Sequence, residues 1–216
     1  MHILIQLWTS FKKKNTTMAN SESNNIPIER HPLQPFLPEG AEILMLGSFP
    51  PKRERWSMDF YYPNIQNDMW RIMGLIFYGD KDYFVEPNGK RFRFCYDKVV
   101  KFCTEKRIAI FDAACAVKRL MDNASDAHLE IVEQTDIPAL LRKTPNCHTI
   151  VSTGGKSAEN IAEQLGFKVP QVGRHTDFIL NGKEYRFYRM PSSSRAFPMK
   201  LEKKAEAYSQ LFCVPS

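Results

Sequence analysis

Apolar runs that are typical of buried strands alternate with helix-like segments along most of this 216-residue chain. The runs lie at residues 42–47, 107–112, 147–152 and 184–190. Such alternation predicts an α/β fold of three layers, α/β/α, in which helices cover both faces of a central, mostly parallel sheet. The length suits one domain of this kind with its own core, and we place that domain at residues 26–216.

The segments between the strands differ in how regular they are. Five of them are expected to form helices, at residues 68–78, 96–103, 137–143, 156–165 and 199–212. Asn181-Gly182 lies between two strand-like arms and is the strongest short signal for a hairpin in the chain. Residues 79–94 are read as an irregular, basic segment and residues 113–135 as a polar connection.

The composition limits the possible partners and cofactors. Thirty Lys and Arg against twenty-four Asp and Glu give a net charge of +6, which favours a polyanionic partner without identifying one. The five cysteines form no C-x-x-C pair and the histidines lack metal-ligand spacing, so we expect no metal. This cysteine usage is typical of reduced thiols in a cytoplasmic protein.

Residues 1–25 are expected to be a disordered tail or an over-extended gene start. The apolar run at residues 1–8 is too short to span a membrane, and its lysines follow the apolar part, whereas in a signal peptide they precede it. We therefore expect no membrane partner. We expect a monomer in the cytoplasm, associated with the nucleoid if the protein is bacterial.

The first loop that could carry chemistry is Gly47-Ser48-Phe49-Pro50-Pro51, at the end of the first strand-like run. A strand that ends in glycine and continues into two prolines predicts a stiff loop with exposed backbone amides, which can hold the edge of a planar base. Taken alone, the pentapeptide fits a plain end to the strand better than a binding site.

Aromatic residues follow this first loop. Phe60-Tyr61-Tyr62 places three rings in a row on a loop, where they are costly to expose unless something stacks on them, as flipped bases do. The other interpretation is that the rings pack the loop onto the domain, which we expect of at least one of them. Asn67 then stands at the start of a helix, where Asn is a favoured cap.

Two further loops follow strand-like runs and begin helix-like ones. Ser152-Thr153-Gly154-Gly155-Lys156-Ser157 lacks the spacing of a phosphate loop, but its amides and Lys156 suit contact with a DNA phosphate. A tight turn with a solvated lysine fits equally well. Met190-Pro191-Ser192-Ser193-Ser194-Arg195 offers small hydroxyls and amides, which suit phosphate contacts, or forms a flexible serine loop.

Together these loops resemble those of the uracil-DNA glycosylase superfamily, most closely its hypoxanthine-type and mismatch-specific branches. The resemblance rests on the glycine-initiated loop, the aromatics, the Pro-Ser-Ser-Ser loop, and Asn67-Asp68-Met69-Trp70, where Met stands in place of the family's Phe. It covers residues 28–213 and implies a three-layer α/β/α fold. It also implies a monofunctional DNA glycosylase without cofactors, which hydrolyses the N-glycosidic bond of a deaminated base flipped out of damaged or mismatched DNA. The base would be uracil, hypoxanthine or xanthine.

The resemblance also assigns candidate site residues. Asn67 is the catalytic candidate, which would orient water or steady the cationic sugar, with Asn64 as a weaker alternative. The base-binding candidates are Gly47, Ser48, Phe49, Pro50, Tyr61 and Tyr62, and one of the three aromatics would stack on the base. The DNA-binding candidates are Gly154, Gly155, Lys156, Ser192, Ser193, Ser194 and Arg195, and Arg195, Ala196 and Phe197 would fill the gap left by the flipped base.

One departure from the family keeps other functions open. Mismatch-specific enzymes carry an Asn two residues after the first-loop glycine, where this chain has Phe49. A binder of damaged or mismatched DNA that does not cut it is therefore the main alternative. A hydrolase of free nucleosides is a third interpretation, which predicts activity without duplex DNA and little dependence of binding on salt.

Overall fold

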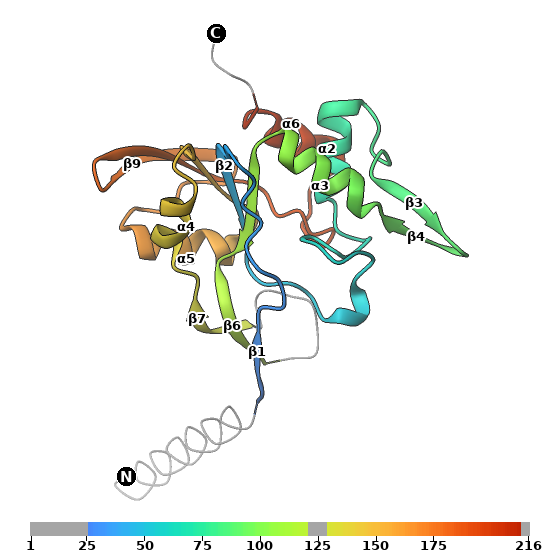
Figure 1. The fold of residues 1–216 in the computed structure, drawn as a ribbon, viewed down its shortest axis with the longest axis horizontal. Coiled ribbons are helices and arrows are strands. Elements are labelled where there is room, and N and C mark those ends of the chain that lie inside the picture. The colour runs from blue at the N-terminus through green and yellow to red at the C-terminus, as the bar shows by residue number, and fades with distance from the viewer. Residues whose placement is uncertain (1–25, 121–128, 213–216) are drawn as a thin grey trace, which may run out of the picture.

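A five-stranded sheet in the order β5-β2-β8-β10-β9 forms the centre of the computed structural model, which describes residues 26–120 and 129–212 (Figure 1). The tail expected at residues 1–25 lies outside the described residues. The strands are β2 (Ile43–Gly47), β5 (Ile108–Asp112), β8 (Thr149–Ser152), β9 (Arg174–Leu180) and β10 (Lys183–Arg189). All of them pair in parallel except β9, which is antiparallel to β10, so the predicted mostly parallel sheet is confirmed.

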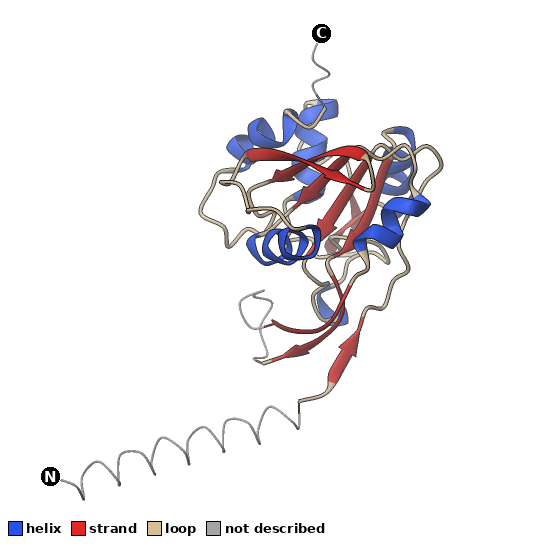
Figure 2. Ribbon diagram, turned by 90° about the vertical axis from the view of Figure 1, so that its left-hand side faces the viewer, coloured by secondary structure: helices blue, strands red, loops and turns tan. Residues whose placement is uncertain are grey.

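Helices cover both faces of this sheet, as Figures 1 and 2 show. One face carries α2 (Met69–Tyr78), α3 (Tyr96–Glu105) and α6 (Leu201–Ser209), and the other carries α4 (Ile137–Lys143) and α5 (Gly155–Leu165). Each lies within a few residues of a helix expected from the sequence. None of the described helices is long and apolar enough to cross a membrane.

The hairpin between β9 and β10 is also confirmed. Leu180 pairs with Lys183 across a two-residue turn. The φ angles of Asn181 and Gly182 are 51° and 79°, in the left-handed region that this type of tight turn requires.

Two segments expected to be irregular form strands instead, so both of those expectations are wrong. Residues 113–135 contain β6 (Ala114–Arg119) and β7 (Leu129–Gln134), which join β1 (Ile28–Arg30) in a second sheet. Residues 79–94 contain a separate hairpin of β3 (Val85–Asn88) and β4 (Arg91–Phe94). The alternation of Arg and Phe in β4 is a strand pattern. In the sequence it resembles an irregular segment because half of its residues are charged. A short 3-10 helix, η1 (Arg53–Arg55), interrupts the aromatic loop.

The order of the strands determines where a ligand can bind. From β2 the chain passes through α2 and α3 to β5 on one side, whereas from β8 it passes through α5 to β10 on the other. In open α/β sheets, ligands bind in the crevice outside the carboxyl ends of two such strands. Here those ends are Gly47 and Ser152.

Gly74 of α2 provides a test of how this layer packs. A Cβ at Gly74 would collide with the backbone oxygen of Asp80, where the chain folds back beside the helix. We therefore expect Gly74→Ala to lower the free energy of unfolding by about 1–3 kcal/mol, although Ala favours a helix over Gly by about 1 kcal/mol. Urea unfolding measures the difference.

Gly155→Ala is the matched control for this prediction. Gly155 also lies in a helix, but the nearest atom to a Cβ there is the end of the Arg189 side chain, at 3.8 Å. If Gly74→Ala left the stability unchanged or increased it, the backbone at Asp80 would be able to move away from the new Cβ at little cost.

Candidate functional site

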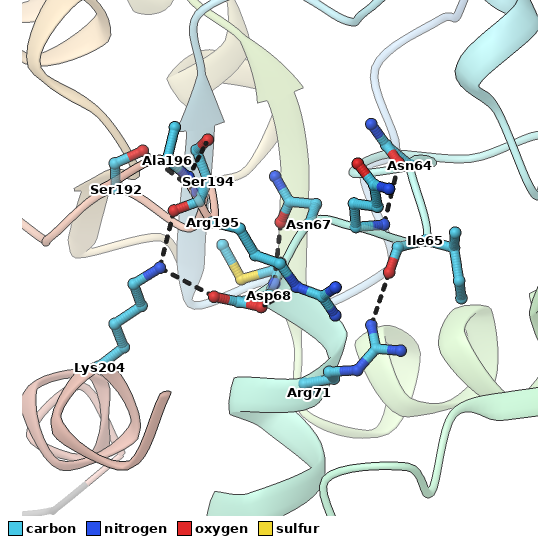
Figure 3. Close-up of polar contacts among 12 residues, drawn as sticks. Asn64, Ile65, Asn67, Asp68, Arg71, Ser192, Ser194, Arg195, Ala196 and Lys204 are labelled. Atoms are coloured by element: carbon cyan, nitrogen blue, oxygen red, sulfur yellow. Dashed lines mark hydrogen bonds and ion pairs between the residues drawn. The ribbon is translucent and has the colours of Figure 1, made fainter. Parts of the chain in front are cut away.

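The first feature of the site is that two loops far apart in the sequence lie side by side (Figure 3). The backbone N–H of Asp68 donates to the carbonyl of Ser193 at 2.9 Å, and Asn67 forms an isolated antiparallel bridge with Ser194. The start of α2 and the serine loop (residues 191–195) are thus joined through their backbones. This contact brings two of the predicted motifs together.

A buried ion-pair network, formed by Asp68, Lys204 and Arg195, holds the same two loops in place. Lys204 Nζ donates to Asp68 Oδ2 at 2.9 Å and to the carbonyl of Ser194 at 2.8 Å, and its side chain is 0% exposed. Arg195 Nε donates to Asp68 Oδ1 at 3.1 Å from a half-exposed position. The carboxylate also precedes the first residue of α2, where the helix dipole favours negative charge.

Asn67 caps the helix and still presents a donor. Its side-chain Oδ1 accepts a hydrogen bond from the backbone N–H of Met69, the first residue of α2, at 2.9 Å. Asn67 thus caps one free amide of the helix, although Asp68 stands at the N-cap position itself. Figure 3 shows the amide nitrogen directed away from the helix, and no other described residue accepts from it. Asn64 Oδ1 accepts from the backbone N–H of Gln66 at 2.9 Å and so stabilises the turn before the helix.

A buried histidine–aspartate pair lies beside Gly47. Asp112, the register partner of Gly47 on β5, accepts from His31 Nε2 at 2.9 Å, and both side chains are buried. A Cβ on Gly47 would collide with Asp112 Oδ1, so only glycine lets this carboxylate approach the first loop so closely. The pair therefore places a carboxylate at the carboxyl end of the sheet.

Tyr62 reaches across the crevice between β2 and β8. Its hydroxyl lies 3.0 Å from Thr153 Oγ1, just after β8, and 3.6 Å from where a Cβ on Gly47 would stand. Its φ is 50°, a conformation that is rare for a bulky residue and that clusters at functional sites. Its ring is half-buried and packs edge-on against Trp70.

The other aromatics of this region pack inside the protein. Phe60 and Tyr61 are 6% and 3% exposed, so the expectation that part of the aromatic run packs onto the domain is confirmed. The Tyr61 hydroxyl donates to the carbonyl of Gln34 at 2.8 Å, and burial, with a further contribution from Asp112, raises the pKa of Tyr61. Tyr61 thus forms the floor of the region, and it has no free face on which a base could stack.

The rest of the first loop faces the small second sheet. Phe49 is half-buried, stands edge-on to His31 with ring centroids 5.4 Å apart, and packs against apolar residues of β6 and β7. Pro50 is buried, and its carbonyl accepts from Arg119 at 3.2 Å. Ser48 is half-buried and lies with Lys156 against the same strands.

The glycine turn after β8 lies at the same edge of the sheet. Gly154 is buried and caps α5 in an extended conformation, and Gly155 is exposed. Lys156 is half-buried and donates to the carbonyl of Leu129, so it is not a freely solvated lysine. In the serine loop Ser193 is buried, Ser192 is half-buried, and Ser194 and Arg195 are exposed.

The sequence analysis missed three residues of this site. His31 had no place in the site expected from the sequence, whereas its side chain is buried beside the first loop. Asp112 could have been found, because it ends a strand of a parallel sheet next to Gly47. Lys204 falls on the apolar face of α6 together with Leu201 and Tyr208, and a lysine at such a position indicates a buried partner.

The described part of the chain contains no cluster of metal-ligating side chains. Within residues 26–120 and 129–212, no three His, Cys, Asp or Glu side chains are grouped so that they could hold a metal ion.

Comparison with known proteins finds similarity to a protein of known sequence and to solved structures. No protein-family model matches the chain. The hypoxanthine DNA glycosylase of Methanosarcina acetivorans is 28% identical over 174 residues, which cover 79% of this chain and 92% of the relative. The solution NMR structure of a candidate uracil DNA glycosylase from the same organism matches with a TM-score of 0.56 and 26% identity, over 86% of this chain and 98% of that one.

Lys204 should be essential to the stability of the site. We expect Lys204→Met to lower the free energy of unfolding by about 3–5 kcal/mol, because it leaves the buried Asp68 carboxylate without its main partner. Lys203→Met is the control, since Lys203 is 69% exposed and pairs only with Glu206 on the surface. Thermal and urea unfolding measure both, and equal effects of the two substitutions would contradict this account of the network.

Proposed function

We propose that this chain, which shares sequence and fold with the hypoxanthine-type branch of the uracil-DNA glycosylase superfamily, is a monofunctional DNA glycosylase. Its substrate would be a deaminated base in duplex DNA, namely uracil, hypoxanthine or xanthine, and its product an abasic site. The relative named as a hypoxanthine DNA glycosylase supports this class of reaction. The observation that carries the proposal is that Asn67 pairs with the serine loop, and that this loop follows β10, which runs in the same direction as β2 and its last residue, Gly47.

The base would enter the crevice between the ends of β2 and β8. The buried Asp112 lies beside Gly47 at the end of β5, and its Oδ1 occupies the space where a Cβ of Gly47 would stand. A carboxylate accepts hydrogen bonds and cannot donate them, and deaminated bases carry a ring N–H beside a carbonyl. Backbone groups of Gly47 and Ser48 would hold the same edge, with Phe49 or Tyr62 against the face of the base.

Asn67 would act on the sugar, nearer the surface. Its Oδ1 is held by the Met69 amide, so its free Nδ2 group would hydrogen-bond the attacking water or the substrate next to the reacting carbon. The oxygen of water forms the new bond to C1′, and the N-glycosidic bond breaks with its electron pair on the base. Preorganised donors stabilise the base as it leaves as an anion.

The serine loop would hold the DNA backbone around the flipped nucleotide. Ser194 and Arg195 are exposed, and small hydroxyls and backbone amides suit phosphate contacts. Because Arg195 is already tied to Asp68, it would fill the vacated gap from a fixed position. Gly155, at the start of α5, would offer its amide to a second phosphate.

A non-catalytic binder of damaged DNA is the second candidate. Two observations favour it, namely Phe49 in the position where mismatch-specific enzymes carry Asn, and the capping bond that occupies the Asn67 side-chain oxygen. The two candidates share the same DNA-binding surface, and only a rate of base release separates them.

A variant of Asn67 that keeps the hydrogen bond from the Met69 amide distinguishes the two candidate functions. We expect wild type to excise one of the three bases from labelled duplexes, detected as strand breaks after alkali. Asn67→Ser keeps a side-chain oxygen to accept the Met69 amide but loses the free amino group, so it should be roughly 10²–10³-fold slower. Asn67→Ala should be as slow, and less stable by about 1 kcal/mol.

The comparison of rate and stability decides between the two roles of Asn67. If Asn67→Ser excised bases at the wild-type rate while Asn67→Ala only lost stability, Asn67 would be a cap alone. If wild type released no base from any of the three duplexes but bound them in a salt-sensitive way, the non-catalytic binder would be the better account.

Asp112→Asn tests the proposed base contact. This substitution keeps the shape of the side chain and an oxygen that can accept from His31, but it presents an amino group in place of Oδ1. We expect excision to fall roughly 10- to 100-fold, as for loss of a hydrogen bond to a charged group. Affinity for undamaged duplex, measured by fluorescence anisotropy, should not change, and unaltered excision would exclude Asp112 from the base site.

A further inference from the structure

The β3–β4 hairpin projects from the body of the protein as an isolated arm (Figure 1). Its strands pair only with each other, from Val85 with Phe94 at the root to Asn88 with Arg91 at the tip. Gly89, with a φ of 61°, opens the two-residue turn. A hairpin with no other sheet partner contributes little to the core, so the exposed residues of its outer part need another explanation.

The outer part of the hairpin combines cations with an exposed ring. Phe92 is 63% exposed, and Lys90, Arg91 and Arg93 surround it in the sequence. Arg93 is paired with Glu86 at 2.7 Å, whereas neither Lys90 nor Arg91 forms an ion pair with another described residue. A bare aromatic ring among unpaired cations fits a nucleic acid, whose backbone takes the charges and whose sugars and bases take the ring.

The root of the hairpin is connected to the candidate site. Phe94 is buried, its backbone N–H donates to Ser57 Oγ at 3.3 Å, and the Arg71 guanidinium lies over its ring at 5.5 Å. Arg71 is in the first turn of α2, and burial, followed by the nearby charge of Arg195, lowers its pKa. Arg71 is also paired with Asp82 at 3.5 Å. The root of the hairpin is thus packed against the first turn of α2, next to the serine loop.

We propose that this hairpin is a second DNA-binding element, which holds the duplex on one side of the lesion. Lys90 and Arg91 at the tip bind phosphates there, and Phe92, on the other face of β4, packs against a neighbouring sugar or base. The four-residue strands extend about 13 Å from the root, so the arm reaches beyond the nucleotides that the serine loop contacts. This inference rests on the proposed action on DNA, and it adds a flank-specific contact.

The neighbouring groove is a poorer candidate for the DNA path. It has a volume of about 680 Å³ between η1 and the hairpin, but Asp59, Glu86 and Asp97 all line it. Three carboxylates oppose a phosphate backbone, and the groove's two arginines, Arg53 and Arg93, are already paired with Asp59 and Glu86. The tip of the hairpin, which carries the unpaired Lys90 and Arg91 and does not line this groove, is therefore the surface that binds.

The salt dependence of binding tests the two kinds of contact separately. The probe is a fluorescent duplex with a tetrahydrofuran abasic-site analogue, titrated at several salt concentrations. Lys90→Ala and Arg91→Ala should each reduce the slope of log affinity against log salt by about 1, as for one lost phosphate contact. Phe92→Ala should weaken binding about 10-fold with the slope unchanged.

Shortening the duplex on one side at a time tests whether the hairpin binds the DNA on one side of the lesion. Wild type should lose affinity when one particular flank is cut to a few base pairs, and Lys90→Ala/Arg91→Ala should be insensitive to that cut. Arg142→Ala is the matched control, because Arg142 is an exposed cation in the last turn of α4, at the opposite edge of the sheet. Circular dichroism and thermal unfolding check that each variant is folded.

These outcomes are distinct from a failure of the proposed glycosylase activity. If wild type excises a base, the hairpin variants should reach the same maximal single-turnover rate at higher half-saturating protein concentration. If it excises none, the salt slopes and flank lengths still decide the proposal. Hairpin variants with the slope, affinity and flank dependence of Arg142→Ala would overturn it.

Discussion

The arrangement of the site depends on one buried carboxylate. Removing the charge of Asp68 from water costs several kcal/mol, which must be offset by well-placed partners. Those partners come from three separate parts of the chain, namely Lys204 of α6, Arg195 of the serine loop and the first turn of α2. Because Lys204 also donates to the Ser194 carbonyl, the charge can be satisfied only when α6, α2 and the serine loop are assembled together. An electrostatic requirement of the core thereby fixes the position of the neighbouring, half-buried Asn67.

The second constraint on the site comes from the sheet, where Gly47 has no side chain. Parallel pairing places Gly47 directly beside Asp112, and the absence of a Cβ on Gly47 leaves room for the carboxylate. His31 holds the other carboxylate oxygen, so the orientation of Asp112 is set before any ligand arrives. Tyr62 closes the opposite side of the crevice in a conformation that a bulky residue rarely adopts. Such preorganisation means that little reordering would accompany the binding of a ligand, which lowers the entropic cost of binding.

The parts of the fold with strong periodicity could be predicted from the sequence. The buried runs of β2, β5 and β8, the five long helices and the Asn181-Gly182 hairpin were all expected at nearly their observed positions. The strands of the two small sheets could not, because β4 and β7 carry charged residues among their apolar ones and so resemble polar loops. For the site, the motif loops were predictable, but pairing between distant side chains was not. The partnership of Asp68 with Lys204 spans 136 positions, and no local pattern encodes it.

Asn67 shows why a structural role and a functional role need not compete. The capping bond uses only the side-chain oxygen, and this bond determines which way the amide lies. The amino group is then directed away from α2, as Figure 3 shows, and it is held there without a hydrogen bond of its own to another described residue. A free asparagine would lose rotamer entropy on binding a substrate, whereas a capped one has already lost it on folding. The cap is therefore what would make this side chain an effective donor, and the same reasoning applies to Arg195, which Asp68 holds at the edge of the crevice.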